Sequence, residues 1–235
     1  MWIHNTVKKM IKVEIGSNES REYAKGTRVE DVIIDVNGRK SSAIAGMIDG
    51  IERDMNHPLD YDCKLRPIDV ESEEGLYILR HSCAHLLAQA VTDIFPEAKP
   101  TIGPPIEHGF YYDFDMEPIS KEDLPKIEKR MKQLSKENLK IVREECDNKT
   151  LRKMFSNNEF KLEIMDEKIG HDVGSSAYRQ GKFVDLCRGP HLSSTGKVGK
   201  YFKLTKVSGA YWRGDSNNEM LQRIYGTSWP SKKEL

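Results

Sequence analysis

The pattern of apolar and polar residues at the start of the chain predicts a small mixed α+β unit. In IKVEIG, residues 11–16, the two kinds of side chain alternate, as in a strand with one buried face. REYAKG, residues 21–26, and CKLRPID, residues 63–69, predict further strands, and RVEDVIIDV, residues 28–36, has apolar residues at helical spacing. A hairpin, a helix and later strands in so short a span indicate a compact β-grasp-like domain over residues 1–69.

An acidic stretch, DVESEEG at residues 69–75, predicts the boundary to a second domain. The next segment, residues 76–95, is rich in apolar residues and predicts a well-buried helix. Ser72 can cap its start, because a serine side chain accepts hydrogen bonds from the free N–H groups of a first turn. Pro96 ends it, because proline cannot continue a helix.

The remaining pattern predicts a larger domain of irregularly mixed helices and strands. SKEDLPKIEKRMKQLSKENLKIV, residues 120–142, has apolar residues at three-four spacing and a capping box at Ser120 and Asp123. NKTLRKMFSNN, residues 148–158, predicts a shorter helix. Strands are predicted at GFYYDFD (109–115), FKLEIM (160–165), KFVDLC (182–187) and KYFKLTKVSGAYWRG (200–214). Because helices and strands do not alternate regularly, we expect the α+β class with a mainly antiparallel sheet.

Composition narrows the kinds of partner. Lysine plus arginine equals aspartate plus glutamate, at 37 each, so a nucleic-acid partner must be held by a local patch and not by overall charge. No apolar run reaches the length of about 18 residues that a membrane span needs, and the N-terminus has no continuous apolar signal core. The 4 cysteines are too few for a disulfide framework in a chain of this length, which favours reduced thiols in the cytoplasm.

Two short motifs carry candidate chemistry. In HSCAH, His81 and His85 stand four apart on the predicted helix, so their side chains project to the same side about 5–6 Å apart. In DLCRGPH, a tight turn after a strand would bring Cys187 and His191 together, with Asp185 on the same side of that strand as Cys187. The spacing alone leaves three alternatives open: a metal site, a catalytic site or ordinary buried side chains. Two histidines, a cysteine and a histidine are a plausible tetrahedral set for zinc.

Four longer motifs resemble one family. LRHSCAHLLAQAV, IGPPIEHGFYYDFD, FVDLCRGPH and FKLTKVSGAYWRGDSNNEMLQRIYGTSW, in this order, are similar to the N-terminal half of bacterial-type threonyl-tRNA synthetase. The resemblance implies a ubiquitin-like TGS domain over residues 1–69. It implies an editing domain over residues 70–228, of the kind shared with alanyl-tRNA synthetase and the free-standing alanyl-tRNA hydrolases. Residues 229–235 would begin a linker to a catalytic domain that is absent here, together with its ATP site and its own zinc. The resemblance leaves open whether the chain is a truncated or a separate protein.

The family resemblance implies hydrolysis of the ester in mischarged Ser-tRNA(Thr), with Thr-tRNA(Thr) spared. It places His81 and Lys161 in the pocket, where ester hydrolysis needs groups that hold and polarise a water molecule, and we expect these two residues to be catalytic. It assigns the substrate pocket to His85, Tyr112, Asp185, Cys187 and His191. The relatives that edit alanyl-tRNA hold zinc with the set His81, His85, Cys187 and His191, whereas the threonyl version is thought to work without metal. We therefore expect no required cofactor, with zinc at this set as the alternative.

The resemblance also implies a partner, the acceptor end of tRNA(Thr). A lysine-rich segment near aromatic residues would suit the phosphates and bases of a single strand. The candidate tRNA-binding residues are Lys197, Lys200, Lys203, Lys206 and Arg213. We expect a cytoplasmic protein without membrane contact, whose full-length parent is homodimeric through the absent catalytic domain. Two alternatives remain: a zinc hydrolase of the alanyl-tRNA trans-editing type, and a non-catalytic RNA-binding module.

Overall fold

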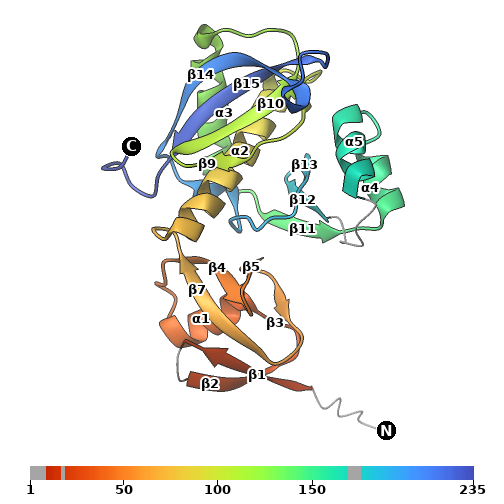
Figure 1. The fold of residues 1–235 in the computed structure, drawn as a ribbon. Helices are drawn as coiled ribbons and strands as arrows, with labels where there is room; N and C mark the ends of the chain where they lie inside the picture. The colour runs from red at the N-terminus through yellow and green to blue at the C-terminus, as the bar shows by residue number, and fades with distance from the viewer. Residues whose placement is uncertain (1–8, 17–18, 169–175) are drawn as a thin grey trace, which may run out of the picture. The chain divides into compact units, whose positions relative to one another are not determined.

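The computed structural model describes residues 9–16, 19–168 and 176–235 (Figure 1). The chain divides into two compact units, the first ending at Gly75 and the second beginning at Leu76. All strand pairs given for the described residues are antiparallel except one. The expected α+β class with mainly antiparallel sheets is therefore confirmed.

The first unit is built around one five-stranded sheet in the order β2-β1-β7-β4-β5. The strands are β1 (Met10–Ile15), β2 (Glu19–Ala24), β4 (Ala43–Ile48), β5 (Ile51–Asp54) and β7 (Cys63–Asp69). The short strands β3 (Thr27–Arg28) and β6 (Pro58–Leu59) pair separately, and α1 spans Val29–Asn37. β1 pairs antiparallel with β2 and parallel with β7.

The core of this unit explains its sequence pattern. The alternation in β1 buries Ile11, Val13 and Ile15 and exposes the residues between them. Val29 of α1 packs closely on Gly46 of β4, where an added Cβ would lie 2.6 Å from a methyl carbon of Val29. The strands expected at residues 11–16, 21–26 and 63–69 and the helix at 28–36 are present. Assignment of the unit to a TGS domain of β-grasp type stays a prediction.

The second unit contains two antiparallel sheets and most of the helices (Figure 1). One sheet has the order β14-β15-β10-β8, with β9 also paired to β10, and the other has the order β11-β12-β13. Its strands are β8 (Lys99–Pro100), β9 (Pro105–Ile106), β10 (Gly109–Asp115), β11 (Ile141–Glu145), β12 (Ser176–Gln180), β13 (Phe183–Leu186), β14 (Phe202–Tyr211) and β15 (Met220–Ser228). The helices are α2 (Glu73–Ile94), α3 (Leu124–Glu137), α4 (Asn148–Met154) and α5 (Glu159–Lys168), with 3-10 turns η1 (Lys121–Asp123), η2 (Thr195–Val198) and η3 (Trp212–Gly214).

Helix α2 is the central element of this unit. Its start is capped as expected, because the Ser72 Oγ accepts a hydrogen bond from the Gly75 N–H at 3.0 Å. Nearly all side chains between Ile78 and Val91 are buried. The helix ends at Ile94, two residues before Pro96. No helix among the described residues combines the length and the apolar character needed to cross a membrane.

Two predictions of secondary structure are wrong, the first of them only in part. The helix predicted over residues 120–142 has its capping box at Ser120 and Asp123, but it ends at Glu137. Asn138 takes the left-handed conformation that commonly follows a helix, with φ of 51°. The chain then continues into β11.

The strand predicted at FKLEIM is instead part of helix α5. Phe160 and Ile164, four apart, pack with Trp212 and Leu221, while Leu162 and Met165 pack into a second cluster. Because this short helix contacts apolar groups on two sides, its sequence shows apolar residues at every second position, which imitates a strand. The Asn158 side chain accepts the Lys161 N–H at 3.2 Å, an N-cap signal that was present in the sequence.

Candidate functional site

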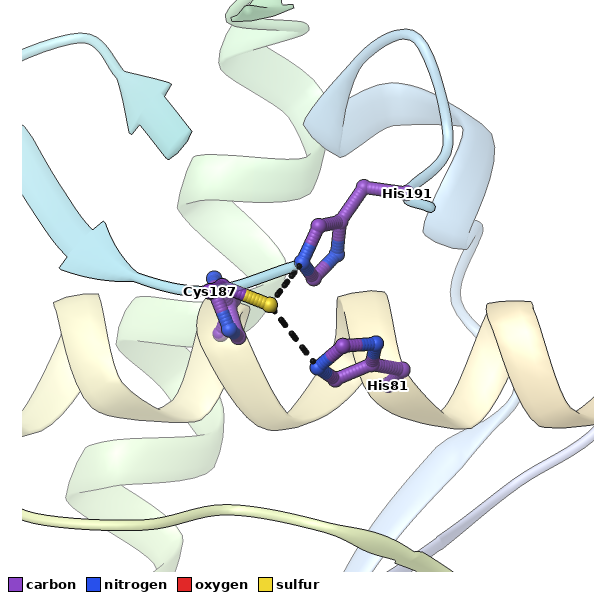
Figure 2. Close-up of side chains that lie close together, drawn as sticks. His81, Cys187 and His191 are labelled. Atoms are coloured by element: carbon purple, nitrogen blue, oxygen red, sulfur yellow. Dashed lines mark hydrogen bonds between the residues drawn. The ribbon is translucent and has the colours of Figure 1, made fainter. Parts of the chain in front are cut away.

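Helix α2 and the segment after β13 bring together the four side chains of the two short motifs. One ring nitrogen from each of His81, His85 and His191 and the sulfur of Cys187 all lie within 4.8 Å of one another. Figure 2 shows His81 projecting from the helix towards the sulfur and His191 approaching it from the following loop. We call these four residues the imidazole–thiol cluster. Each motif brings its own two side chains together, as its spacing predicted, and the fold brings the two pairs together.

Three groups contact the sulfur of this cluster. The Sγ of Cys187 lies 3.3 Å from the Nε2 of His81 and 3.2 Å from the Nε2 of His191 (Figure 2). The Gly189 N–H donates to the same sulfur at 3.3 Å. Gly189 has a φ of 72°, and a Cβ there would lie 1.9 Å from the hydroxyl oxygen of Tyr178. The turn that returns the chain to the cluster thus requires glycine.

A buried ion pair adjoins the cluster. The Nζ of Lys161 on α5 lies 2.5 Å from the Oδ1 of Asp185 on β13, and these side chains are 3% and 2% exposed. We call them the lysine–aspartate pair. Tyr112 of β10 donates its hydroxyl hydrogen to the Oδ2 of Asp185 and accepts a hydrogen bond from the Nζ of Lys161 at 3.3 Å. The Nε2 of His85 lies 3.4 Å from the Oδ2 of Asp185, which joins the two groups into one site.

Burial determines the protonation of the histidines. It lowers the pKa of His81 to about 3, with the nearby His85 adding to the effect, and it lowers the pKa of His85 to about 4. Burial also lowers the pKa of His191 well below its ordinary value, again with a contribution from the other two rings. All three rings are therefore neutral at pH 7, and each has one nitrogen that can accept a proton.

In contrast to the neutral histidines, the lysine–aspartate pair is charged. Burial alone would raise the pKa of Asp185, but the adjacent Lys161 ammonium and His85 outweigh it and hold this pKa below its ordinary value. Burial, followed by the nearby carboxylate of Asp185, raises the pKa of the Tyr112 phenol well above 10.0. The site thus combines a neutral nitrogen-and-sulfur side with a charged oxygen-and-ammonium side.

The cluster could hold a metal ion. Three imidazoles and one thiolate are typical zinc ligands, and four ligands within 4.8 Å of one another suit tetrahedral coordination. The ring nitrogens that face away are also oriented: the Nδ1 of His191 lies 3.2 Å from the Ser82 Oγ, and His85 contacts Asp185. Such outer contacts are usual around histidine ligands. The donor set therefore fits zinc in number, kind and proximity.

The structure places the candidate tRNA-binding residues in differing surroundings. Lys200 lies over the ring of Tyr201, with its Nζ 5.5 Å from the ring centre, and Lys206 lies over Tyr225 at 4.3 Å. The Lys203 ammonium lies 3.2 Å from the carboxylate of Glu128, and Lys197 belongs to η2. Arg213 is held by two carboxylates, those of Glu163 and Glu167, at 2.6 and 2.5 Å. Its charge is therefore largely compensated within the unit.

Sequence reasoning missed three residues that shape the site. Ser82 is completely buried and contacts His191. The ring centre of Tyr178 lies 4.5 Å from that of His191. Gly103 lies against Tyr112, where an added Cβ would be 2.0 Å from a ring carbon. Ser82 could have been found from its place between two histidines on the helix. For the other two, only the structure brings the partners together.

Comparison with known proteins adds the class of protein. Residues 176–225 match the family described as the threonyl and alanyl tRNA synthetase second additional domain. Asp185, Cys187 and His191 lie inside this matched segment, whereas His81 and Lys161 come from outside it. Over this segment the second unit is therefore similar to a domain of threonyl and alanyl tRNA synthetases.

Threonine–tRNA ligases of several bacteria are similar to the chain over nearly its whole length. The chain is 45% identical over 228 residues to the enzyme of Rubrobacter xylanophilus, covering 96% of this chain and 35% of that protein. It is 48% identical over 227 residues to the enzyme of Hahella chejuensis, covering 95% and 35%. With threonine–tRNA ligase 1 of Bacillus subtilis it shares 47% identity over 230 residues, covering 96% and 36%. The expected resemblance to threonyl-tRNA synthetases is confirmed, and the chain spans about 35% of the length of these relatives.

Proposed function

We propose that the second unit is an editing hydrolase that cleaves the ester of mischarged Ser-tRNA(Thr) and spares Thr-tRNA(Thr). The observation that carries this proposal is the convergence of the imidazole–thiol cluster and the lysine–aspartate pair on one buried site. Neutral imidazoles next to a buried ammonium are groups that can move protons and stabilise negative charge. The similarity to threonine–tRNA ligases supports the choice of substrate.

In the proposed reaction a water molecule attacks the carbonyl carbon that links the seryl group to the terminal ribose. His81 accepts a proton from this water, which its neutral ring can do at pH 7. Negative charge develops on the carbonyl oxygen, and the Lys161 ammonium stabilises it in a site from which bulk water is excluded. The carbon–oxygen bond to the ribose then breaks, and a proton returns to the ribose hydroxyl. The products are serine and uncharged tRNA.

The other polar residues of the site would form the seryl pocket. These are His85, Tyr112, Asp185, Cys187 and His191. Serine and threonine differ by one methyl group, and a synthetic site shaped for threonine discriminates against the smaller serine by only roughly 10–200-fold. A second pocket that admits the smaller side chain can exclude the larger one by overlap, because packed atoms yield only with strain.

We propose further that this hydrolysis needs no metal. The support is the similarity to threonine–tRNA ligases along nearly the whole chain, because the threonyl version of this domain is the one expected to work without metal. If zinc were bound, the imidazole–thiol cluster would hold it, and the ion would supply Lewis acidity and an activated water. Turnover after exhaustive chelation is the expected result. Complete loss with chelator, restored by zinc, would favour the alanyl-type mechanism.

The same proposal includes the partner, the domain bounds and the cellular setting. The acceptor end of tRNA(Thr) would be the partner, and the first unit, over residues 1–69, would be a TGS domain. The editing domain would cover residues 70–228, with a linker from residue 229. Threonine activation with ATP, the catalytic zinc and homodimerisation would belong to the part of the relatives that this chain does not cover. The setting would be the cytoplasm.

A second candidate is a zinc-dependent hydrolase of the alanyl-tRNA editing type. The fit of the imidazole–thiol cluster to zinc favours it, and so does the matched family, whose description includes the alanyl enzymes. A third candidate is an RNA-binding module without turnover. It would make the same tRNA contacts, but it would leave the buried ionisable groups without a function. The similarity to threonine–tRNA ligases along nearly the whole chain favours the first proposal.

The deciding experiment is single-turnover deacylation with the protein in excess. Ser-tRNA(Thr), Thr-tRNA(Thr) and Ser-tRNA(Ala) are tested side by side. We expect fast release of serine from tRNA(Thr) and much slower release of threonine. Equal rates for the first two substrates would contradict selective editing, preference for Ser-tRNA(Ala) would favour the alanyl type, and no release above background would leave only the binding module.

A further inference from the structure

Ser82 is a completely buried hydroxyl in contact with the site. It belongs to α2, directly after His81, and its side chain turns towards the loop that follows β13. The Leu192 N–H donates to the Ser82 Oγ at 3.0 Å, and the Nδ1 of His191 lies 3.2 Å from the same oxygen. In the part of the chain that the structure describes, these two groups are the hydrogen-bond partners of this hydroxyl.

The position of the hydrogen atoms follows from these two contacts. A backbone N–H can only donate, so the Ser82 oxygen is the acceptor in its contact with Leu192. The hydroxyl hydrogen then needs an acceptor of its own, because a buried donor without one is destabilising. The Nδ1 of His191 is the available atom. When Nδ1 accepts, the single proton of the neutral ring must lie on Nε2.

This tautomer determines what His191 presents to the rest of the site. Its Nε2 lies 3.2 Å from the Cys187 sulfur, so the ring donates an N–H to that sulfur. The Gly189 N–H donates to the same atom at 3.3 Å. Two N–H groups, one fixed by the backbone and one by Ser82, therefore hold the sulfur in place.

We propose that Ser82 is a positioning residue that holds His191 in the tautomer protonated on Nε2 and thereby fixes the Cys187 side chain. Its relevance to editing rests on the proposed function, because Cys187 and His191 are there part of the seryl pocket. The hydrogen-bonding assignment itself does not depend on the reaction.

The direct test is the tautomer of His191, measured by nitrogen-15 NMR of the whole chain after removal of metal by a chelator. Two-bond couplings between ring nitrogens and ring protons show which nitrogen carries the hydrogen. We expect protonation on Nε2 in the unaltered protein and in Ser82→Thr, which keeps the hydroxyl. In Ser82→Ala we expect a mixture or the Nδ1–H form. Thr92→Ala, which removes a hydroxyl bonded to backbone carbonyls on the same helix, should change nothing.

Two results would overturn the proposal: protonation on Nδ1 in the unaltered protein, or an unchanged tautomer in Ser82→Ala. A folding defect in Ser82→Thr leaves the test intact, because the unaltered protein and the alanine variant alone decide it.

Kinetics show whether the tautomer matters to editing. Loss of one hydrogen bond of this kind corresponds to roughly 2–12-fold, so Ser82→Ala should slow single-turnover release of serine by about this factor, with the half-saturating protein concentration unchanged. A shifted tautomer with an unchanged rate would remove the role in editing. If the unaltered protein releases no serine, the proposed function fails, while the NMR result still decides the role of Ser82.

Discussion

The two units of the chain differ in what they bury. Among the described residues of the first unit, every buried side chain is hydrophobic. Examples are Val13, Val29 and Leu65. The second unit buries apolar residues too, but it also buries Lys161, Asp185 and the imidazoles of His85 and His191. Burial of apolar surface stabilises a fold directly, whereas burial of ionisable groups is costly unless they are paired.

This difference in buried side chains indicates which unit contains the functional site. The first unit needs nothing beyond hydrophobic burial and a regular sheet. In the second, ionisable groups with shifted pKa values lie together in one place, which is typical of functional sites. If this interpretation is right, substitutions of charged or titrating residues should have large effects in the second unit and small effects in the first.

The largest expected effect is on hydrolysis. His81→Ala should lower the single-turnover rate of serine release by roughly 10²–10⁴-fold, because it removes the proposed proton acceptor. Binding of tRNA should change little. The matched control is His108→Ala, since His108 is an exposed histidine of the same unit. Near-normal turnover in His81→Ala would move the role elsewhere, with His85 the first candidate.

The next effect is on stability. Lys161→Met leaves the Asp185 carboxylate buried without its cation, which should lower the free energy of unfolding by about 3–5 kcal/mol. In the first unit, Lys64 and Glu14 form a pair at 3.5 Å with side chains 77% and 49% exposed. Removing such a pair should cost at most about 1 kcal/mol, so Lys64→Met is the control. Urea unfolding measures both, and equal losses would break the comparison between the units.

Acid should separate the two units. The folded-state pKa values of His81 and His85 are lowered to about 3 and 4, from an ordinary value of 6.5. In the unfolded chain these histidines take up protons at a higher pH than in the folded protein. The free energy of unfolding is therefore highest above pH 6.5, and it decreases as the pH falls towards 4, by up to about 1.4 kcal/mol per pH unit for each histidine. Amide exchange should accelerate in β12 and β13 well before it does in β1 and β7. The same acceleration in both units would contradict the assignment of the acid sensitivity to the buried histidines of the second unit.

The smallest effects concern tRNA binding. Lys200→Ala should weaken binding a few-fold and reduce the dependence of log affinity on log salt by about one unit, if Lys200 contacts a phosphate. Lys203→Ala should do less, because its ammonium already neighbours Glu128. Arg213→Ala should do least, since two carboxylates hold that side chain. A stronger effect for Arg213 than for Lys200 would reverse this ranking.

The sequence predicted the imidazole–thiol cluster because its members lie within two short motifs. Four-residue spacing on a helix fixes the relation of His81 to His85, and a turn containing Gly189 fixes that of Cys187 to His191. Such local geometry can be derived from dihedral preferences alone. Their meeting across the fold rested on the family resemblance, and the structure brings them together.

The lysine–aspartate pair could not be predicted from local sequence patterns. Lys161 was placed on a strand, but it lies on a helix whose two buried sides hide the helical period. Its partners Asp185 and Tyr112 are 24 and 49 positions away in the chain, so no local pattern reveals the contact. Ser82 differs from these residues, because it stands next to His81 in the HSCAH motif and could have been found there, although its contact with Leu192 is seen only in the structure.

The central claim is that the buried ion pair serves chemistry rather than stability, and one double variant tests it most directly. Lys161→Met combined with Asp185→Asn replaces both charges by neutral groups of similar size, with an amide oxygen left to accept the Tyr112 hydroxyl. The account predicts that most of the stability lost in Lys161→Met returns, while single-turnover release of serine stays at least about 100-fold below that of the unaltered chain. A double variant that is stable and also releases serine at the normal rate would contradict the account.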